Sequence, residues 1–259
     1  MKRKIKSLTG FSIGATDGEI GNVKEFYFDD ETWTIRYLIV ETGGWLFGRK
    51  VLISPHSIQH SDWENKIFEA NLTKEQVRNS PDIDTDKPIS RQHEILLNQY
   101  YPWPSYWGDG LWAGGLGVTG MMAPVTLPLE QAVAEEAKSP NEKYNPHLRS
   151  TSALTGYSIK ATDGDIGEIE DFLIDEDRMK IDFIVVDTGA WLPGKKVLLS
   201  PDLIKEINWN SSKILVNATV EQVRTSPEYD ADRPMDDEYV ASHQSHYGGF
   251  THLNQNRNQ

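Results

Sequence analysis

Residues Ala15–Gly21 read ATDGEIG, and nearly the same phrase returns as ATDGDIG at Ala161–Gly167. Sliding the chain by 146 residues aligns positions 8–88 with positions 154–234 without a gap, and roughly 38 of these 81 positions are identical. Independent sequences do not agree at this level, so the chain carries one unit of about 80 residues twice. A unit of this size is small but can bury its own core.

The repeated phrase itself predicts a tight turn. Its Asp–Gly pair, Asp17 and Gly18 in the first copy, supplies the positive φ that such a turn needs. Gly21 at the end of the phrase predicts a bulge or a close approach of another backbone segment.

Each copy is predicted to be mainly β. In the first copy, EIGNVKEFYFD and WTIRYLIVET are rich in β-branched and aromatic residues, and acidic residues 29–31 lie where a hairpin turn belongs. Shorter strands are expected at KVLIS, SIQHSDW and KIFEAN, and the second copy repeats the pattern with its acidic turn at 175–177. Many short strands between Gly, Pro and Asp turns indicate a small barrel or sandwich.

A short helix closes each copy. Thr73 and Thr219 are predicted N-caps, each followed three residues later by a glutamine that completes a capping box. Pro81 and Pro227 end the helices, and an acidic extended arm follows each of them.

The order LTGFSIGATDGEIGNVKEFYFDD, followed by IRYLIVETGGWLFGRKVLISPHSI, resembles the PRC-barrel family. This β-barrel module occurs in the cytoplasmic H subunit of purple-bacterial reaction centres and at the C-terminus of ribosome-maturation factors. The resemblance covers both copies and implies two tandem PRC-type β-barrels, each with a short helix and an extended arm. It also implies a docking module without catalytic residues. No membrane span or RNA-binding domain precedes the first copy, so the functions of those two relatives are not expected.

We expect four segments along the chain. They are a first barrel unit at 1–89, an aromatic, Gly- and Pro-rich linker at 90–153, a second barrel unit at 154–236 and a flexible polar tail at 237–259.

The composition narrows the classes of function. A net charge of −13, with a basic cluster only in the initial MKRKIK, argues against nucleic-acid binding. The chain has no cysteine, which removes thiolate metal sites and a cysteine nucleophile. The polar stretch after the basic start is unlike a secretory signal, and we expect a cytoplasmic protein.

The linker contains a cluster of aromatic residues in YYPWPSYWGDGLW. These residues either attach the linker to a barrel or to the groove between the barrels, or they bind a partner, because Trp and Tyr are favoured at interfaces. The uncharged stretch 111–129 approaches the length of a membrane span, but its glycines and prolines argue against one. Peripheral membrane contact stays open for this segment.

Metal and catalytic patterns are incomplete. Asp82, Asp84 and Asp86 alternate as calcium ligands do, but the following residues break the loop pattern, and a solvated arm is expected. His243 and His246 form HxxH in the predicted tail, with nothing nearby to complete a zinc site. No nucleophile, phosphate-loop or dinucleotide motif is present, so we predict neither an enzyme nor a bound metal or cofactor.

The loops TGGWLFGRK and TGAWLPGKK are the expected contact surface, because each places a tryptophan beside two basic residues in an acidic unit. The alternative is that each tryptophan caps its own barrel. The predicted interaction residues are Trp45, Arg49, Lys50, Trp103, Tyr106, Trp107, Trp191, Lys195 and Lys196.

The functional hypothesis is a non-enzymatic adaptor or assembly module that binds a protein partner, with a homodimer through barrel faces as a further possibility. Two alternatives remain. One is a small-molecule or metal-binding sensor that uses the cleft between the barrels. The other is a peripheral organiser of a membrane complex.

Overall fold

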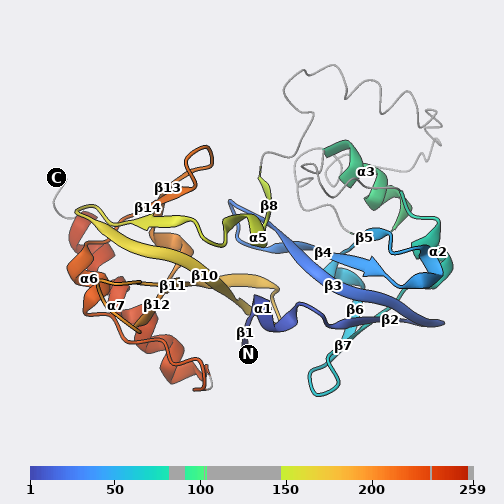
Figure 1. The fold of residues 1–259 in the computed structure, drawn as a ribbon, viewed down its shortest axis with the longest axis horizontal. Helices are drawn as coiled ribbons and strands as arrows, with labels where there is room; N and C mark the ends of the chain where they lie inside the picture. The colour runs from blue at the N-terminus through green and yellow to red at the C-terminus, as the bar shows by residue number, and fades with distance from the viewer. Residues whose placement is uncertain (82–90, 102, 104–146, 234, 256–259) are drawn as a thin grey trace, which may run out of the picture. The chain divides into compact units, whose positions relative to one another are not determined.

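The computed structural model describes residues 1–81, 91–101, 103, 147–233 and 235–255, and Figure 1 shows it as a ribbon. The described chain forms two seven-stranded sheets with a few short helices, so the mainly β prediction is confirmed. The β-rich architecture agrees with two tandem barrel-like domains.

The first copy contains the predicted strands and the predicted short helix, together with further elements that the sequence did not predict. Its elements are β1 (Lys2–Lys4), α1 (Ile5–Leu8), β2 (Ser12–Ala15), β3 (Gly18–Asp29), β4 (Ile35–Thr42), η1 (Gly44–Leu46), β5 (Lys50–Ile53), η2 (Pro55–Ser57), β6 (Ile58–Asp62), β7 (Ile67–Ala70), α2 (Lys74–Arg78) and α3 (Arg91–Tyr100).

The second copy repeats this order. Its elements are β8 (Leu148–Ser150), α5 (Thr151–Leu154), β9 (Ser158–Lys160), β10 (Asp165–Asp175), β11 (Lys180–Asp187), β12 (Lys196–Leu199), η3 (Pro201–Leu203), β13 (Ile204–Asn208), β14 (Lys213–Val216), α6 (Val220–Arg224) and α7 (Asp237–Gln255).

The two sheets have the same topology. The strand orders are β5-β4-β3-β2-β7-β6 and β12-β11-β10-β9-β14-β13, with parallel pairing only where β2 meets β7 and where β9 meets β14 among the described pairs. The first strand of each copy joins the sheet of the other copy, because β1 pairs with β10 and β8 pairs with β3.

The two compact units of the structure do not coincide with the two copies of the sequence repeat. One unit comprises Met1–Phe11, Val23–Leu38 and Arg149–Gln259, and the other comprises Ser12–Asn22 and Ile39–Leu148. The first unit therefore contains residues from both copies.

The repeated phrase anchors each copy at two points. Asp17 Oδ1 accepts a hydrogen bond from the Lys74 backbone N–H at 2.8 Å, and Asp163 does the same for Val220 at 2.8 Å. The turn aspartate therefore caps the following helix in addition to the Thr73 and Thr219 capping boxes, both of which are present as predicted.

Two helices lie where the sequence analysis expected a linker and a flexible tail. Helix α3 begins the predicted linker, and the 19-residue helix α7 occupies most of the predicted tail. The side chain of Asp236 accepts a hydrogen bond from the Tyr239 backbone N–H at 2.8 Å, which caps the start of α7. Helix α7 thus stands where a flexible tail was expected, and its Tyr239 and Val240 pack at the apolar cluster of the second sheet.

Gly21 shows why the phrase ends in glycine. A Cβ atom at Gly21 would overlap the backbone carbonyl of Glu41, and one at Gly167 would overlap the carbonyl of Asp187. The two strands approach too closely for any side chain, so the close approach predicted for Gly21 is confirmed.

We expect Gly21→Ala to lower the free energy of unfolding by at least about 2 kcal/mol, because the backbone of β4 must move to admit the methyl group. Urea denaturation measures the change. Gly44→Ala is the matched control, since a Cβ atom there meets nothing within 4 Å. Equal stability of the two variants would contradict the close-approach explanation.

Candidate interaction surfaces

The acidic hairpin turns of the two copies meet each other within the first compact unit. The backbone N–H of Ile35 donates to the Met179 carbonyl at 2.7 Å, and the N–H of Ile181 donates to the Trp33 carbonyl at 2.7 Å. A shift of 146 residues along the sequence maps each of these two hydrogen bonds onto the other. Thr34 and Lys180, which form an isolated β-bridge between the turns, are also equivalent positions. The contact thus has local two-fold symmetry, as a closed homodimer would have.

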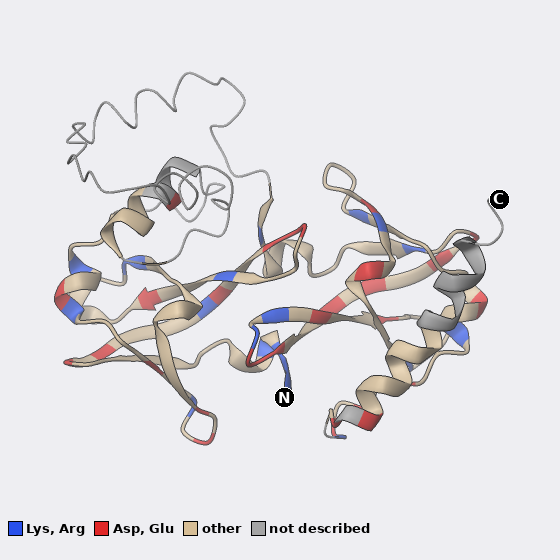
Figure 2. Cartoon of the chain, turned by 180° about the vertical axis from the view of Figure 1, so that it is seen from behind, with Lys and Arg blue, Asp and Glu red and all other residues tan. Residues whose placement is uncertain are grey.

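Ion pairs reinforce the exchanged strands. Arg3 Nε lies 2.6 Å from Glu176 Oε2, and the equivalent Arg149 Nε lies 3.0 Å from Asp30 Oδ2. Strand β1 is visible as the blue segment beside the N-terminus in Figure 2, because it consists of Lys2, Arg3 and Lys4. The basic start of the chain therefore neutralises the acidic turn of the second copy.

Lys2 forms the most buried of these ion pairs. Its side chain is 10% exposed, and Nζ lies 2.9 Å from Asp175 Oδ2 and also contacts the Asp182 carboxylate. Burial alone would raise the pKa of Asp175, but hydrogen bonds from Lys2 and Arg178 outweigh it and hold that pKa well below its ordinary value.

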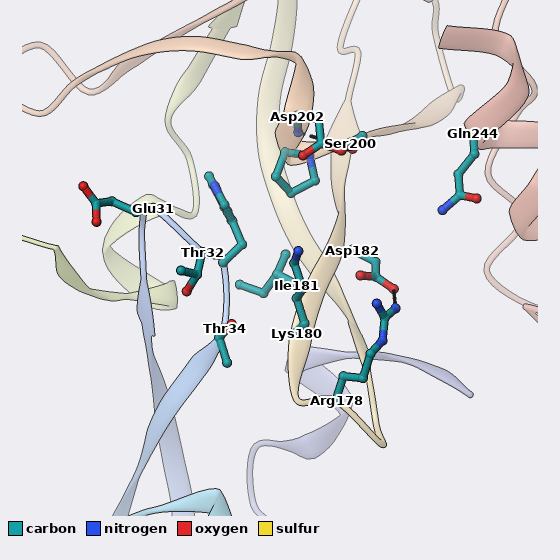
Figure 3. Close-up of a pocket in the computed structure, with 12 residues that line it drawn as sticks. Glu31, Thr32, Thr34, Arg178, Lys180, Ile181, Asp182, Ser200, Asp202 and Gln244 are labelled. Atoms are coloured by element: carbon teal, nitrogen blue, oxygen red, sulfur yellow. Dashed lines mark hydrogen bonds and ion pairs between the residues drawn. The ribbon is translucent and has the colours of Figure 1, made fainter. Parts of the chain in front are cut away.

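A polar cavity of about 470 Å³ lies next to these turns (Figure 3). Arg178 spans part of it and pairs with Asp182 at 2.8 Å. Gln244 of helix α7 contributes from the opposite side, and Ser200 and Asp202 contribute from the start of η3. The lining carries charges of both signs, which suits a small polar ligand rather than an apolar one.

A second surface lies under helix α7. Residues 171–174 of β10 and 183–186 of β11 are buried on both faces of the sheet. One of these faces packs against α7 and the segment before it. We call this surface the helix-binding face of the second copy. It consists of Leu173, Phe183, Val185, Leu198, Gln222 and Ser226.

Helix α7 contributes aromatic residues to this contact. Tyr239 joins the apolar cluster, and its hydroxyl donates to the Glu228 carbonyl at 2.9 Å. His246 Nε2 lies 2.8 Å from the Gln222 carbonyl oxygen. Tyr247 is buried, which raises the pKa of its phenol to about 12.

Helix α3 binds the first copy at the same place and in the same register. Tyr100, which is equivalent to His246, donates to the Gln76 carbonyl at 2.9 Å, and Gln76 is equivalent to Gln222. Tyr101, which is equivalent to Tyr247, is 1% exposed, and burial raises its pKa to about 12 as well. The structural repeat thus continues past the aligned region and includes a bound helix, with Gln76 and Ser80 marking the helix-binding face of the first copy.

The loop tryptophans donate to their own sheets. Trp45 Nε1 donates to the Ile20 carbonyl at 2.8 Å, and Trp191 Nε1 donates to the equivalent carbonyl of Ile166. The ammonium of Lys74 lies 4.5 Å from the centre of the Trp45 ring. Both tryptophans are half-buried, so part of each ring stays accessible.

Arg49 and Lys195 also bind backbone carbonyls of their own copy. Arg49 donates to the carbonyls of Ser80 and Pro81 at 2.8 and 2.9 Å, just beyond the end of α2. Lys195 donates to the carbonyls of Arg224 and Ser226 at 2.8 and 2.7 Å at the equivalent place. Such contacts satisfy carbonyl groups that a helix end leaves open.

The remaining predicted interaction residues differ in their surroundings. Lys50 is exposed, and Lys196 Nζ lies 2.5 Å from Glu170 Oε1. Trp103 stacks on Tyr101 with ring centres 4.2 Å apart, and its Nε1 donates to Ser57 Oγ at 2.7 Å. Tyr106 and Trp107 lie outside the described residues.

Phe47 is the most exposed aromatic residue of the described chain. It lies in the Trp45 loop with φ of 57°, and its side chain is 97% exposed. The loop therefore presents an apolar side chain to solvent in addition to the half-buried tryptophan.

Sequence reasoning missed both helix-binding faces and the pairing of the turns. The apolar runs Phe172–Ile174 and Phe183–Val186 could have predicted a helix-binding face, because continuous apolar residues in an antiparallel strand indicate that both faces of the sheet are covered. The opposite charges of MKRKIK and of the acidic turn at 175–177 could have predicted that the start of the chain lies near that turn.

Among the described residues, no group of three or more histidine, aspartate and glutamate side chains is arranged to hold a metal ion. No helix in the same part of the chain combines the length and apolarity needed to span a bilayer.

Comparison with known proteins identifies the repeat. The sequence model of the PRC-barrel domain matches residues 3–77 and again residues 150–223. A protein of Deinococcus radiodurans, described as an uncharacterized protein, is 30% identical over 81 residues, which is 31% of this chain and 29% of that protein.

Replacement of Lys2 tests the strand exchange. We expect Lys2→Ala to lower the free energy of unfolding by about 1–3 kcal/mol, because Asp175 and Asp182 lose their buried partner and keep only the more exposed Arg178. Lys205→Ala, which removes an exposed lysine from β13, should change it by less than about 0.5 kcal/mol. An equally small effect of both substitutions in urea denaturation would count against the exchange.

Replacement of Arg49 separates a structural from a binding role. Arg49→Met should cost about 1–2 kcal/mol of unfolding free energy, because the carbonyls beyond α2 lose their donor. Substitution of its exposed neighbour, Lys50→Met, should leave thermal and urea stability nearly unchanged. An unchanged free energy of unfolding for Arg49→Met would contradict a stabilising role of these carbonyl contacts.

Proposed function

The chain belongs to the PRC-barrel family through both of its copies, and from this premise we propose that it is a non-enzymatic adaptor whose helix-binding faces take up helical segments of partner proteins. PRC-barrel domains are protein-interaction modules. The adaptor role and the helical nature of the partner are the steps that we add.

One observation carries the proposal: equivalent faces of the two copies bind two helices of different sequence. The aligned segments 91–101 and 237–247 share one identical residue, Tyr101 and Tyr247. Both helices nevertheless place an equivalent side chain, Tyr100 or His246, at the equivalent glutamine carbonyl. The faces beneath them come from copies that are nearly half identical. A surface that tolerates such variation in its occupant suits a module that binds partner segments.

The chemistry of the face favours a helix with one apolar side. Burial of aromatic and aliphatic residues supplies the free energy of binding, and the backbone carbonyls of Gln76 and Gln222 fix the register by accepting hydrogen bonds. This is the common mode in which an amphipathic helix lies on an apolar surface of its partner.

Duplication gives an adaptor two such faces in one chain. A protein partner, in the cytoplasm, is the proposed ligand, and a homodimer through the barrel faces remains a further prediction. The charge of −13 supports a protein rather than a nucleic acid as the partner.

A second candidate function is a sensor for a small polar ligand. The cavity of about 470 Å³ beside the paired turns favours it, because its size suits a small molecule and its lining offers charges of both signs. The third hypothesis, a peripheral organiser of a membrane complex, depends on residues 111–129, which lie outside the described residues.

A peptide of residues 91–103 tests the adaptor proposal in the full chain. We expect it to bind Tyr247→Ala at least about tenfold more tightly than the unmodified protein, because loosening α7 increases the fraction of chains with an open face. Fluorescence anisotropy of the labelled peptide measures the affinity.

Ser245→Ala is the control, since Ser245 is exposed on α7 and its hydroxyl donates only to the nearby Ser242 carbonyl. This variant should bind the peptide as the unmodified protein does. Absence of peptide binding to the Tyr247→Ala variant, with that variant folded, would contradict the proposal.

A further inference from the structure

The two bound helices differ at one fully buried position. Leu97 of α3 is 1% exposed, and the equivalent residue of α7 is His243, which is 0% exposed. An apolar residue fits such a place, whereas an imidazole carries two polar nitrogens into it.

Neither ring nitrogen of His243 has a hydrogen-bonding partner among the described residues. The ring instead packs edge-on against aromatic groups, with its centre 4.7 Å from that of Tyr239 and 6.4 Å from that of Phe183. Buried polar atoms are nearly always paired in proteins, so this histidine weakens the binding of the helix that carries it.

The groups around His243 oppose its protonation. Burial, together with the charges of His246 on the same helix and of Arg233 before the helix, lowers the pKa of His243 to about 4. The sheet contributes the apolar Leu173 and Phe183 to this cluster. Asp171 and Glu170 of β10 act instead on Tyr229.

We propose that helix α7 is a pH-controlled latch: protonation of His243 releases the helix and opens the helix-binding face of the second copy, whereas α3, with Leu97 in that place, stays bound. The release itself is independent of any partner. That the opened face then binds a partner helix rests on the proposed function.

The direction of the effect follows from the two states of the helix. When α7 is released, His243 titrates near its ordinary value of 6.5, and when α7 is bound, it titrates at about 4. Above pH 6.5 the residue is neutral in both states, and the helix stays bound. As the pH falls below 6.5, only the released state takes up a proton, so the ratio of released to bound helix rises by roughly 30-fold at pH 5.

Hydrogen exchange of the full chain tests the latch without any partner. We expect the protection factors of the backbone amides of residues 240–247 to fall roughly 30-fold between pH 7.5 and pH 5, while those of residues 96–100 in α3 change little. His243→Leu, which copies the first helix, should abolish the fall, and Leu97→His should transfer it to α3.

Three results would overturn the latch. They are unchanged protection of α7 between the two pH values, the same fall in the His243→Leu variant, and a pKa of His243 above about 6 measured by NMR in the unmodified protein. The NMR measurement needs no substitution, so the test stands even if a variant fails to fold. His246→Gln controls for the second histidine of the helix and should retain the pH dependence.

Discussion

The central strands of each copy are apolar on both faces, and this constraint shapes the rest of the structure. In the second copy, the residues from Phe172 to Ile174 and from Phe183 to Val186 are all buried, although neighbours along a strand point to opposite sides. One set of these side chains faces the inside of the barrel-like sheet, and the other set needs a further layer of structure to cover it. Helix α7 provides that layer through Tyr239 and Val240.

Duplication adds a second constraint, which is that equivalent segments meet. The turns at Thr34 and Lys180 pair through bonds that the repeat interconverts, and each copy gives its first strand to the sheet of the other. The acidic residues of these turns therefore serve more than turn formation. They hold the basic side chains of the exchanged strands, so that the first compact unit includes residues of both copies.

Local signals made much of the fold predictable. The repeat, the strand order and the capping boxes at Thr73 and Thr219 depend on residues close together in the sequence, and all of them are confirmed. Helices α3 and α7 were missed because their aligned sequences share one residue between 91–101 and 237–247, so the visible repeat ends before them. Their positions depend on tertiary contacts, such as those of Tyr100 and His246 with the glutamine carbonyls, which no local pattern encodes.

The predicted interaction residues show a similar limit. The tryptophan and basic residues of the two loops were identified from their types, but the sequence could not assign their partners. Arg49 and Lys195 donate to carbonyls near a helix end, and Trp45 and Trp191 donate to carbonyls of a neighbouring strand. The sequence alone does not distinguish a side chain that binds a backbone carbonyl of its own copy from one that binds a partner protein.

The central claim is that each copy offers a face that accepts a helix, and mapping a bound helix by NMR tests it most directly. The measurement follows backbone amide shifts of the isotope-labelled Tyr247→Ala chain as an unlabelled peptide of residues 91–103 is added. The account predicts shifts at the helix-binding face of the second copy, at Phe183, Leu198 and Gln222. Shifts confined to the polar cavity, at Thr34 and Asp182, would contradict it.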